Sequence, residues 1–111
     1  SGTFTGNNEI DNKEKKTPKV KDKWVDELGV TWYMEKGTFV SDRVIFLRWG
    51  ARTSSTKITL LPAGSIIKYD AFAHSGGYVW LRQPRGNGQY GYLATGESRN
   101  GQRLSYWGKF N

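Results

Sequence analysis

Cysteine is absent from this chain of 111 residues, and histidine occurs once, at position 74. Without cysteine there is no disulfide, no thiolate nucleophile and no cysteine-ligated metal. Zinc normally takes at least three protein ligands from His, Cys and carboxylates, which a chain with one histidine does not easily supply. We therefore expect no metal and no other cofactor.

Recognisable catalytic motifs are also missing. No serine lies in a nucleophile motif, and no Walker loop is present. Asp26 and Glu27 are the one adjacent carboxylate pair in the part expected to fold, but neighbours on a strand point to opposite faces and cannot easily share a glycosidase site. His74 falls at an expected hairpin turn, where an exposed histidine is the simpler interpretation. The sequence predicts a binding module, not an enzyme.

Long apolar segments are lacking as well. No run approaches the roughly 20 residues of a membrane span, and the start, SGTFTGNNEI, has no hydrophobic core of a signal peptide. Residues 1–22 are too polar to offset the entropy of ordering, which predicts a flexible linker or tail. One domain is expected over residues 23–111, and the polar start resembles the interior of a longer protein.

The chain is rich in glycine, with 14 residues, and in aromatic side chains, at 14%. Neither a heptad nor a useful helical period occurs, so we predict an all-β fold, a small barrel of about seven to eight short antiparallel strands. A short helix at WVDELG is an alternative to strand, and MEKG is expected to be a turn. Strands are predicted at residues 38–40, 43–49, 57–61, 65–73, 78–83, 89–94 and 104–110.

The stretch from Lys68 to Leu93 concentrates aromatic side chains on three expected strands. Alternation directs Val79 and Leu81 inward and the side chains between and beside them outward. For Trp80, a core position at the barrel end is the equal alternative. Tyrosine and tryptophan give a large contact area at low entropic cost. The outward candidates for a binding surface are Tyr78, Trp80, Arg82, Tyr90 and Tyr92.

A formal net charge of +7 attracts the folded part to polyanions. Single-stranded nucleic acid is one candidate, since basic small barrels with interleaved rings bind it. The phosphate-rich envelope of a bacterium is another. A proline-rich peptide is a third, because Asp26, Glu27 and Glu35 could form an acidic loop. The arginines are scattered along the sequence, which weakens the nucleic-acid hypothesis.

Several motifs in order resemble the bacterial SH3 (SH3b) family. IFLRWGARTSSTKITLLPAGSIIKYD is similar to its core pattern of an apolar–Arg strand, a polar loop, a short strand, a glycine turn and a strand ending in tyrosine. GVTWYMEKGTF, YDAFAHSGGYVW, GQYGYLATGE and YWGKF are similar to the cell-wall-targeting subgroup found in phage endolysins and lysostaphin-like bacteriocins. The resemblance covers residues 24–111.

The resemblance implies a monomeric, non-catalytic barrel that binds the peptide part of Gram-positive peptidoglycan. It also implies a covalently linked catalytic domain of a peptidoglycan hydrolase, N-terminal to this segment. The expected place of action is the Gram-positive cell wall, on its extracellular side. A phage endolysin would be made in the host cytoplasm and released through holin pores. No nucleic acid and no membrane are expected as partners. The groove residues carried over from the family are Asp26, Leu28, Tyr33, Phe46, Ala71, Ala73 and Tyr92.

Three of these positions differ from glycine-bridge-binding members of the subgroup. Leu28 replaces a tyrosine, Ala71 a glutamate and Ala73 a methionine. The resemblance therefore implies a cross-bridge with side chains, such as alanine or serine, in a groove with less bulk.

Overall fold

The computed structural model describes residues 22–111, so the linker predicted for residues 1–22 lies outside the described residues except for Asp22. The described part contains strands and no helix, and hence no helix that could cross a membrane. The predicted all-β class is confirmed, with nine strands rather than seven or eight because two short arms are added. The strands are β2 (Lys23–Val25), β3 (Thr31–Ser41), β4 (Ile45–Arg48), β5 (Lys57–Leu61), β6 (Ile66–Ser75), β7 (Tyr78–Gly86), β8 (Gln89–Arg99), β9 (Gln102–Arg103) and β10 (Gly108–Phe110).

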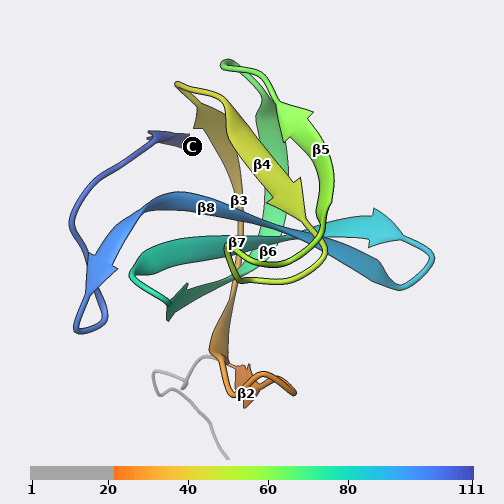
Figure 1. Cartoon of the computed structure of the whole chain (residues 1–111), viewed down its shortest axis with the longest axis vertical. Helices are drawn as coiled ribbons and strands as arrows, with labels where there is room; N and C mark the ends of the chain where they lie inside the picture. The colour runs from red at the N-terminus through yellow and green to blue at the C-terminus, as the bar shows by residue number, and fades with distance from the viewer. Residues whose placement is uncertain (1–21) are drawn as a thin grey trace, which may run out of the picture.

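These strands form one strongly curved antiparallel sheet (Figure 1). Along the sheet the order is β10-β3-β6-β7-β8-β4-β5, and the two arms attach to it, β2 to β3 and β9 to β8. The consecutive strands β6, β7 and β8 form its centre. The residues that alternate on these three strands therefore determine what each face of the sheet carries.

Three two-residue loops join the consecutive strands from β6 to β9. Both loop residues have positive φ in Gly76–Gly77, Asn87–Gly88 and Asn100–Gly101, the pattern of the tight turns that suit twisted hairpins. The Asn100–Gly101 turn was predicted. The five-residue PRGNG turn is wrong: β7 and β8 extend along it, and only Asn87 and Gly88 are left to form the loop.

The turn predicted at MEKG is also wrong. β3 runs through it, and a bulge between Met34 and Gly37 absorbs one extra residue opposite β6. A Cβ at Gly37 would lie 2.7 Å from Cζ of Tyr69. Glycine is therefore present so that the Tyr69 ring can cross the strand, and it does not mark a chain reversal. The alternative helix at WVDELG is replaced by β2 and a turn.

The last predicted strand, residues 104–110, is shorter than expected, because only Gly108–Phe110 is β-structure. The backbone N–H groups of Leu104 and Trp107 donate to the carbonyls of Glu97 (2.7 Å) and Thr95 (3.0 Å) in β8. Gly108 pairs instead with Ser41 in β3. The segment thus crosses from one strand to another, and alternation in the sequence cannot show such a crossing.

Two hydrophobic clusters fill the molecule. The first lies inside the curved sheet and contains Phe39, Ile45, Leu47, Ile67, Tyr69, Leu81 and Leu93. The second contains Val30, Trp32, Ala51, Ala71, Ala73 and Trp80. Val79, Trp80 and Leu81 are all nearly inaccessible to solvent, so β7 is covered on both faces. The predicted outward orientation of Trp80 is corrected, and the alternative of a core position holds.

Candidate functional site

Arg82 lies at the centre of a stack of side chains beside the second cluster. Its Nε and Nη2 donate to Oδ1 and Oδ2 of Asp70 at 2.9 and 3.0 Å. The guanidinium carbon lies 4.6 Å from the ring centroid of Trp24 and 3.9 Å from that of Tyr90. Arginine can stack on rings while its planar fork is held by a carboxylate. The stack therefore fixes Trp24 of β2 against the β7–β8 hairpin.

Asp26 organises the loop that follows β2. Its Oδ1 accepts hydrogen bonds from the backbone N–H groups of Leu28 and Val30, both at 2.9 Å, and its Oδ2 accepts one from Nε1 of Trp32 at 2.9 Å. Burial raises the pKa of Asp26, but the hydrogen bonds from Trp32, Val30 and Leu28 outweigh it and hold that pKa below its usual value. Asp26 thus presents Leu28 at the surface.

Two tryptophans and a tyrosine lie beside this loop over a floor of small residues. Ala71 and Ala73 of β6 are fully buried, and their small side chains leave room for Trp32 and Trp80, which are 1% and 2% exposed. The ring of Tyr92 packs against Trp32 with centroids 5.3 Å apart. Burial raises the pKa of the Tyr92 phenol, and nearby Arg82 partly opposes this change. Tyr92 therefore presents a neutral hydroxyl at ordinary pH.

Phe46 extends the same side of the sheet onto β4. Its ring is 39% exposed and lies 4.2 Å from Nζ of Lys57 and 5.3 Å from the guanidinium carbon of Arg48. Arg48 is paired across the sheet with Tyr92. The result is a continuous surface, which we call the aromatic surface and define as Trp24, Asp26, Leu28, Phe46, Arg82, Tyr90 and Tyr92.

Six of the eleven residues expected in a site thus meet on the aromatic surface. Ala71, Ala73 and Trp80 lie beneath it with buried side chains, so they shape it without facing solvent. Tyr33 does not join it: its ring stacks on Phe72 at 5.4 Å, on the opposite face of the sheet. Tyr78 packs at the end of the second cluster against Trp80.

Sequence reasoning missed Trp24 as a part of this surface and Trp32 and Asp70 as the side chains that support it. Trp24 contacts Arg82 and is the outer ring of the stack. Arg82 was expected as an outward binding candidate, but Asp70 already neutralises its charge. Only the register of β6 against β7, which pairs Ala71 with Arg82, brings Asp70 within reach.

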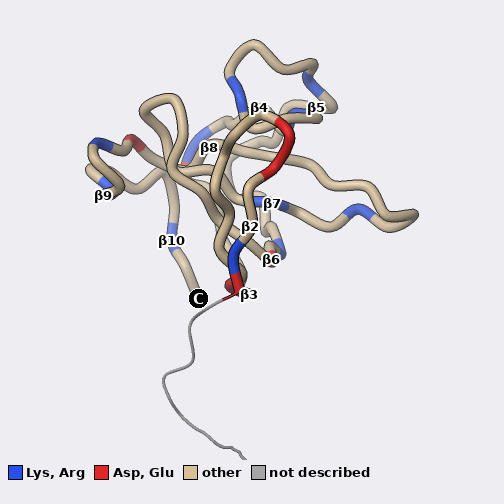
Figure 2. Tube along the Cα trace, turned by 90° about the horizontal axis from the view of Figure 1, so that it is seen from below, with Lys and Arg blue, Asp and Glu red and all other residues tan. Residues whose placement is uncertain are grey.

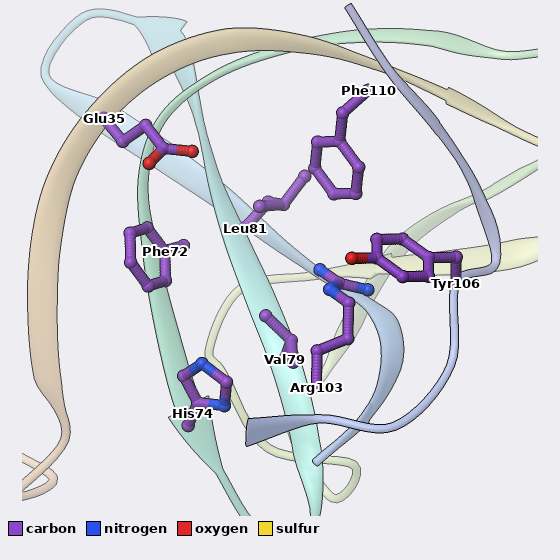
Figure 3. A pocket seen from close by; sticks show the side chains of 8 residues that line it. All are labelled: Glu35, Phe72, His74, Val79, Leu81, Arg103, Tyr106 and Phe110. Atoms are coloured by element: carbon purple, nitrogen blue, oxygen red, sulfur yellow. The ribbon is translucent and has the colours of Figure 1, made fainter. Parts of the chain in front are cut away.

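The opposite face carries a cavity of about 290 Å³ between β6, β7 and the segment that leads to β10 (Figure 3). His74 lies in it, on a strand and half-buried, with Nδ1 2.6 Å from Oγ of Ser98. The expected exposed turn position for His74 is therefore wrong. The residues that line the cavity are Glu35, Phe72, His74, Val79, Leu81, Arg103, Tyr106 and Phe110.

Positive charge is distributed over the whole molecule. Figure 2 shows lysine and arginine on several strands and loops. Arg43 and Arg82 form ion pairs, with Asp42 and Asp70 respectively. In residues 22–111, no group of three or more His, Asp or Glu side chains is arranged to hold a metal ion.

Comparison with known proteins gives related matches in sequence and in structure. The model of a bacterial SH3 domain family (SH3_5) matches residues 31–95. A probable autolysin PH from Staphylococcus aureus (strain NCTC 8325 / PS 47) is 33% identical over 114 residues, which cover 99% of this chain and 24% of the autolysin. The chain thus spans about a quarter of that relative's length.

Two solved structures share the fold. The cell wall targeting domain of the peptidoglycan hydrolase ALE-1 has a TM-score of 0.71 at 25% identity, over 85% of this chain and 98% of that domain. The SH3b domain of lysostaphin in a P4-G5 complex has a TM-score of 0.73 at 24% identity, over 81% and 100%. The first of these is named as a targeting domain and not as a catalytic one, in agreement with the predicted binding module. Because the family model spans more than half of the sequence, this chain belongs to the bacterial SH3 domain family.

Proposed function

We propose that this domain is a non-catalytic cell-wall-binding module. In this proposal it recognises the peptide part of Gram-positive peptidoglycan and holds a covalently linked hydrolase domain, N-terminal to it, at the wall. The names of its relatives support the proposal: one is a probable autolysin, one is a cell wall targeting domain, and one is a lysostaphin SH3b domain in a P4-G5 complex. The observation that carries it is the aromatic surface.

That surface suits a thin peptide with few side chains. Such a ligand offers backbone amides and little apolar area, so a receptor gains most from rigid, flat rings with polar tips. Trp24 and Tyr90 are fixed in advance by Arg82, and the Leu28 loop is fixed by Asp26. Rings that are already ordered lose little entropy when a ligand binds.

The proposed cross-bridge is one that carries small side chains, such as alanine or serine. Leu28 is 41% exposed and gives the loop an aliphatic tip. Ala71 and Ala73 are buried, so they act on the ligand through the two indoles that they accommodate. A methyl or hydroxymethyl side chain on the bridge could then contact aliphatic and aromatic carbon beside its backbone.

Sedimentation of the purified domain with intact sacculi tests this proposal. We expect co-sedimentation with sacculi from Gram-positive species, both before and after wall teichoic acids are removed, and stronger retention where the bridge contains alanine or serine. A domain that stays in the supernatant with every species tried would refute the proposal.

The salt dependence of binding distinguishes the nucleic-acid hypothesis from peptide recognition. Binding driven by phosphate contacts falls steeply between about 50 and 200 mM salt, whereas peptide binding on rings changes little. We expect retention on sacculi to be nearly constant over this range. Titration with a proline-rich peptide and with single-stranded DNA at the upper salt concentration provides the two negative controls.

A further inference from the structure

Arg103 of β9 uses only part of its hydrogen-bonding capacity. Nη1 donates to the carbonyls of Thr95 (2.7 Å) and Ser105 (3.1 Å), and Nη2 donates to Oγ1 of Thr95 (2.9 Å). A guanidinium has five N–H donors. Both oxygens of Thr95 lie at the end formed by the two terminal nitrogens. Within residues 22–111, the edge formed by Nε and Nη2 therefore keeps donors without an acceptor.

Arg82 shows what this edge does elsewhere in the same protein. There the Nε and Nη2 groups donate to the two carboxylate oxygens of Asp70. Arg103 forms no ion pair within residues 22–111. Burial lowers the pKa of Arg103, a change that the phenols of Tyr106 and Tyr69 partly oppose. The partly buried guanidinium of Arg103 therefore lacks, within residues 22–111, the carboxylate partner that Asp70 provides for Arg82.

Arg103 lines a cavity whose walls are mostly apolar. Figure 3 shows the guanidinium pointing into the group of side chains, next to the hydroxyl of Tyr106. The guanidinium carbon is 4.7 Å from the Tyr106 ring centroid and 4.9 Å from that of Phe110, so its position is fixed. Phe72 and Val79 supply hydrocarbon, and Glu35 lies at the far end.

We propose that this cavity is a carboxylate-binding site in which the Nε and Nη2 groups of Arg103 hold a small, singly charged carboxylic acid with an apolar substituent. Two parallel N–H groups match the two oxygens of a carboxylate. The ring and aliphatic walls accommodate a methyl-sized group, and Glu35 repels a second negative charge. The site lies on the opposite face from the aromatic surface and goes beyond the proposed function, because it requires no cell wall.

Two-dimensional amide NMR of the unaltered protein, titrated with N-acetylalanine, tests the site. We expect saturable shifts at Arg103, His74 and Phe72, with an affinity on the order of millimolar for so small a ligand. N-acetylalanine amide has the same shape without the charge and should bind at least about tenfold more weakly. Equal shifts with the acid and the amide would overturn the proposal.

Two further probes define the chemistry. N-acetylglutamic acid α-amide carries only a side-chain carboxylate. If it binds, the site accepts carboxylates in general, and if it does not bind, the site is specific for the carboxylate at the end of a chain. Both outcomes support the proposal. Inorganic phosphate should give no saturable shift. If it produces the same shifts as N-acetylalanine, the site is not a carboxylate site and the proposal is wrong.

Matched variants connect the effect to one side chain. Arg103→Lys keeps the charge but loses the fork, and should weaken N-acetylalanine binding at least about tenfold. Arg85→Gln removes an exposed arginine on the β7–β8 hairpin and should change nothing. Unchanged binding in Arg103→Lys would contradict the assignment. Should this variant fail to fold, the comparison of acid and amide in the unaltered protein still decides.

Discussion

Asp70 and Arg82 form a two-bond ion pair in which both side chains are largely withdrawn from solvent, with exposed fractions of 16% and 14%. The pair joins β6 to β7, and the guanidinium lies between the rings of Trp24 and Tyr90. One carboxylate thus neutralises the cation on which two rings of the aromatic surface stack. The surface depends on a contact that is largely withdrawn from solvent.

Asp70→Asn should lower the free energy of unfolding by about 2 kcal/mol, the usual contribution of hydrogen bonds to a charged group. The amide keeps the shape of the side chain but leaves the guanidinium of Arg82 without a counter-charge. Chemical denaturation measures the loss. Asp42→Asn is the matched control, because its ion pair with Arg43 is more than half exposed and should contribute less than about 1 kcal/mol. Equal losses of unfolding free energy in the two variants would show that burial and ring stacking do not strengthen the Asp70–Arg82 pair.

Tyr90→Ala should reduce retention of the domain on Gram-positive sacculi by about tenfold, because an aromatic anchor typically contributes 1 kcal/mol or more to binding. The far side of the Tyr90 ring already rests on Arg82, so the ring is fixed before any ligand binds. Tyr33→Ala is the control, since Tyr33 stacks on Phe72 on the opposite face. Loss of retention in Tyr33→Ala alone would place the binding surface on the other side of the sheet.

His74 should titrate below its usual pKa of 6.5, because burial lowers the pKa and Arg103 lowers it further. The unfolded chain then holds more protons than the folded chain between the two pKa values. Stability therefore falls as the pH drops below about 6.5 and levels off below the folded pKa. As His74 is the one histidine in the sequence, its ring proton signals give the folded pKa directly by NMR.

The Arg103→Gln variant separates the two causes of the His74 shift. Its His74 pKa should rise part of the way towards 6.5, since burial, the larger cause, is retained. Arg85→Gln should leave the titration unchanged. A normal His74 pKa in the unaltered protein would contradict the packing of its ring beside Ser98 and Phe72.

Gly108→Ala should destabilise the protein by about 1–3 kcal/mol, the usual cost of overpacking. A Cβ there would overlap the carbonyl oxygen of Val40, which is backbone, and would lie 2.7 Å from Cζ of Phe39 in the core. Gly50→Ala is the control, because its Cβ would meet only the side chain of Ser55, whose hydroxyl can rotate away. Thermal unfolding compares the two. A Gly108→Ala protein as stable as the control would mean that β10 moves freely.

Alternation and turn residues predicted much of the sheet correctly. Residues 57–61 form β5 as expected, and Asn100–Gly101 forms a tight turn. The errors occurred where a glycine serves close packing, as Gly37 does beside Tyr69, and where a segment changes partner, as Trp107 and Gly108 do. Both depend on residues far away in the chain, which local pattern does not contain.

For the candidate site too, local pattern predicted some features and missed those that depend on distant residues. Tyr90 and Tyr92 share a face in the sequence and in the structure, because the period of a strand is two. Trp80 shares that face with Arg82 but is buried, since the segment before β3 and the loop around Ala51 cover one part of β7 and leave another open. Alternation gives the face of a residue and not what lies over it.

The sequence by itself determined the fold class of this protein, because many turns, alternating strands and an aromatic-rich centre favour a small β-fold. Tertiary structure alone decided which side chains are free to bind. It neutralised Arg82 with Asp70, buried Trp80 over two alanines and, within residues 22–111, left one edge of Arg103 without an acceptor. Charge and exposure are properties of a side chain's neighbours in space, and strand register and curvature determine those neighbours.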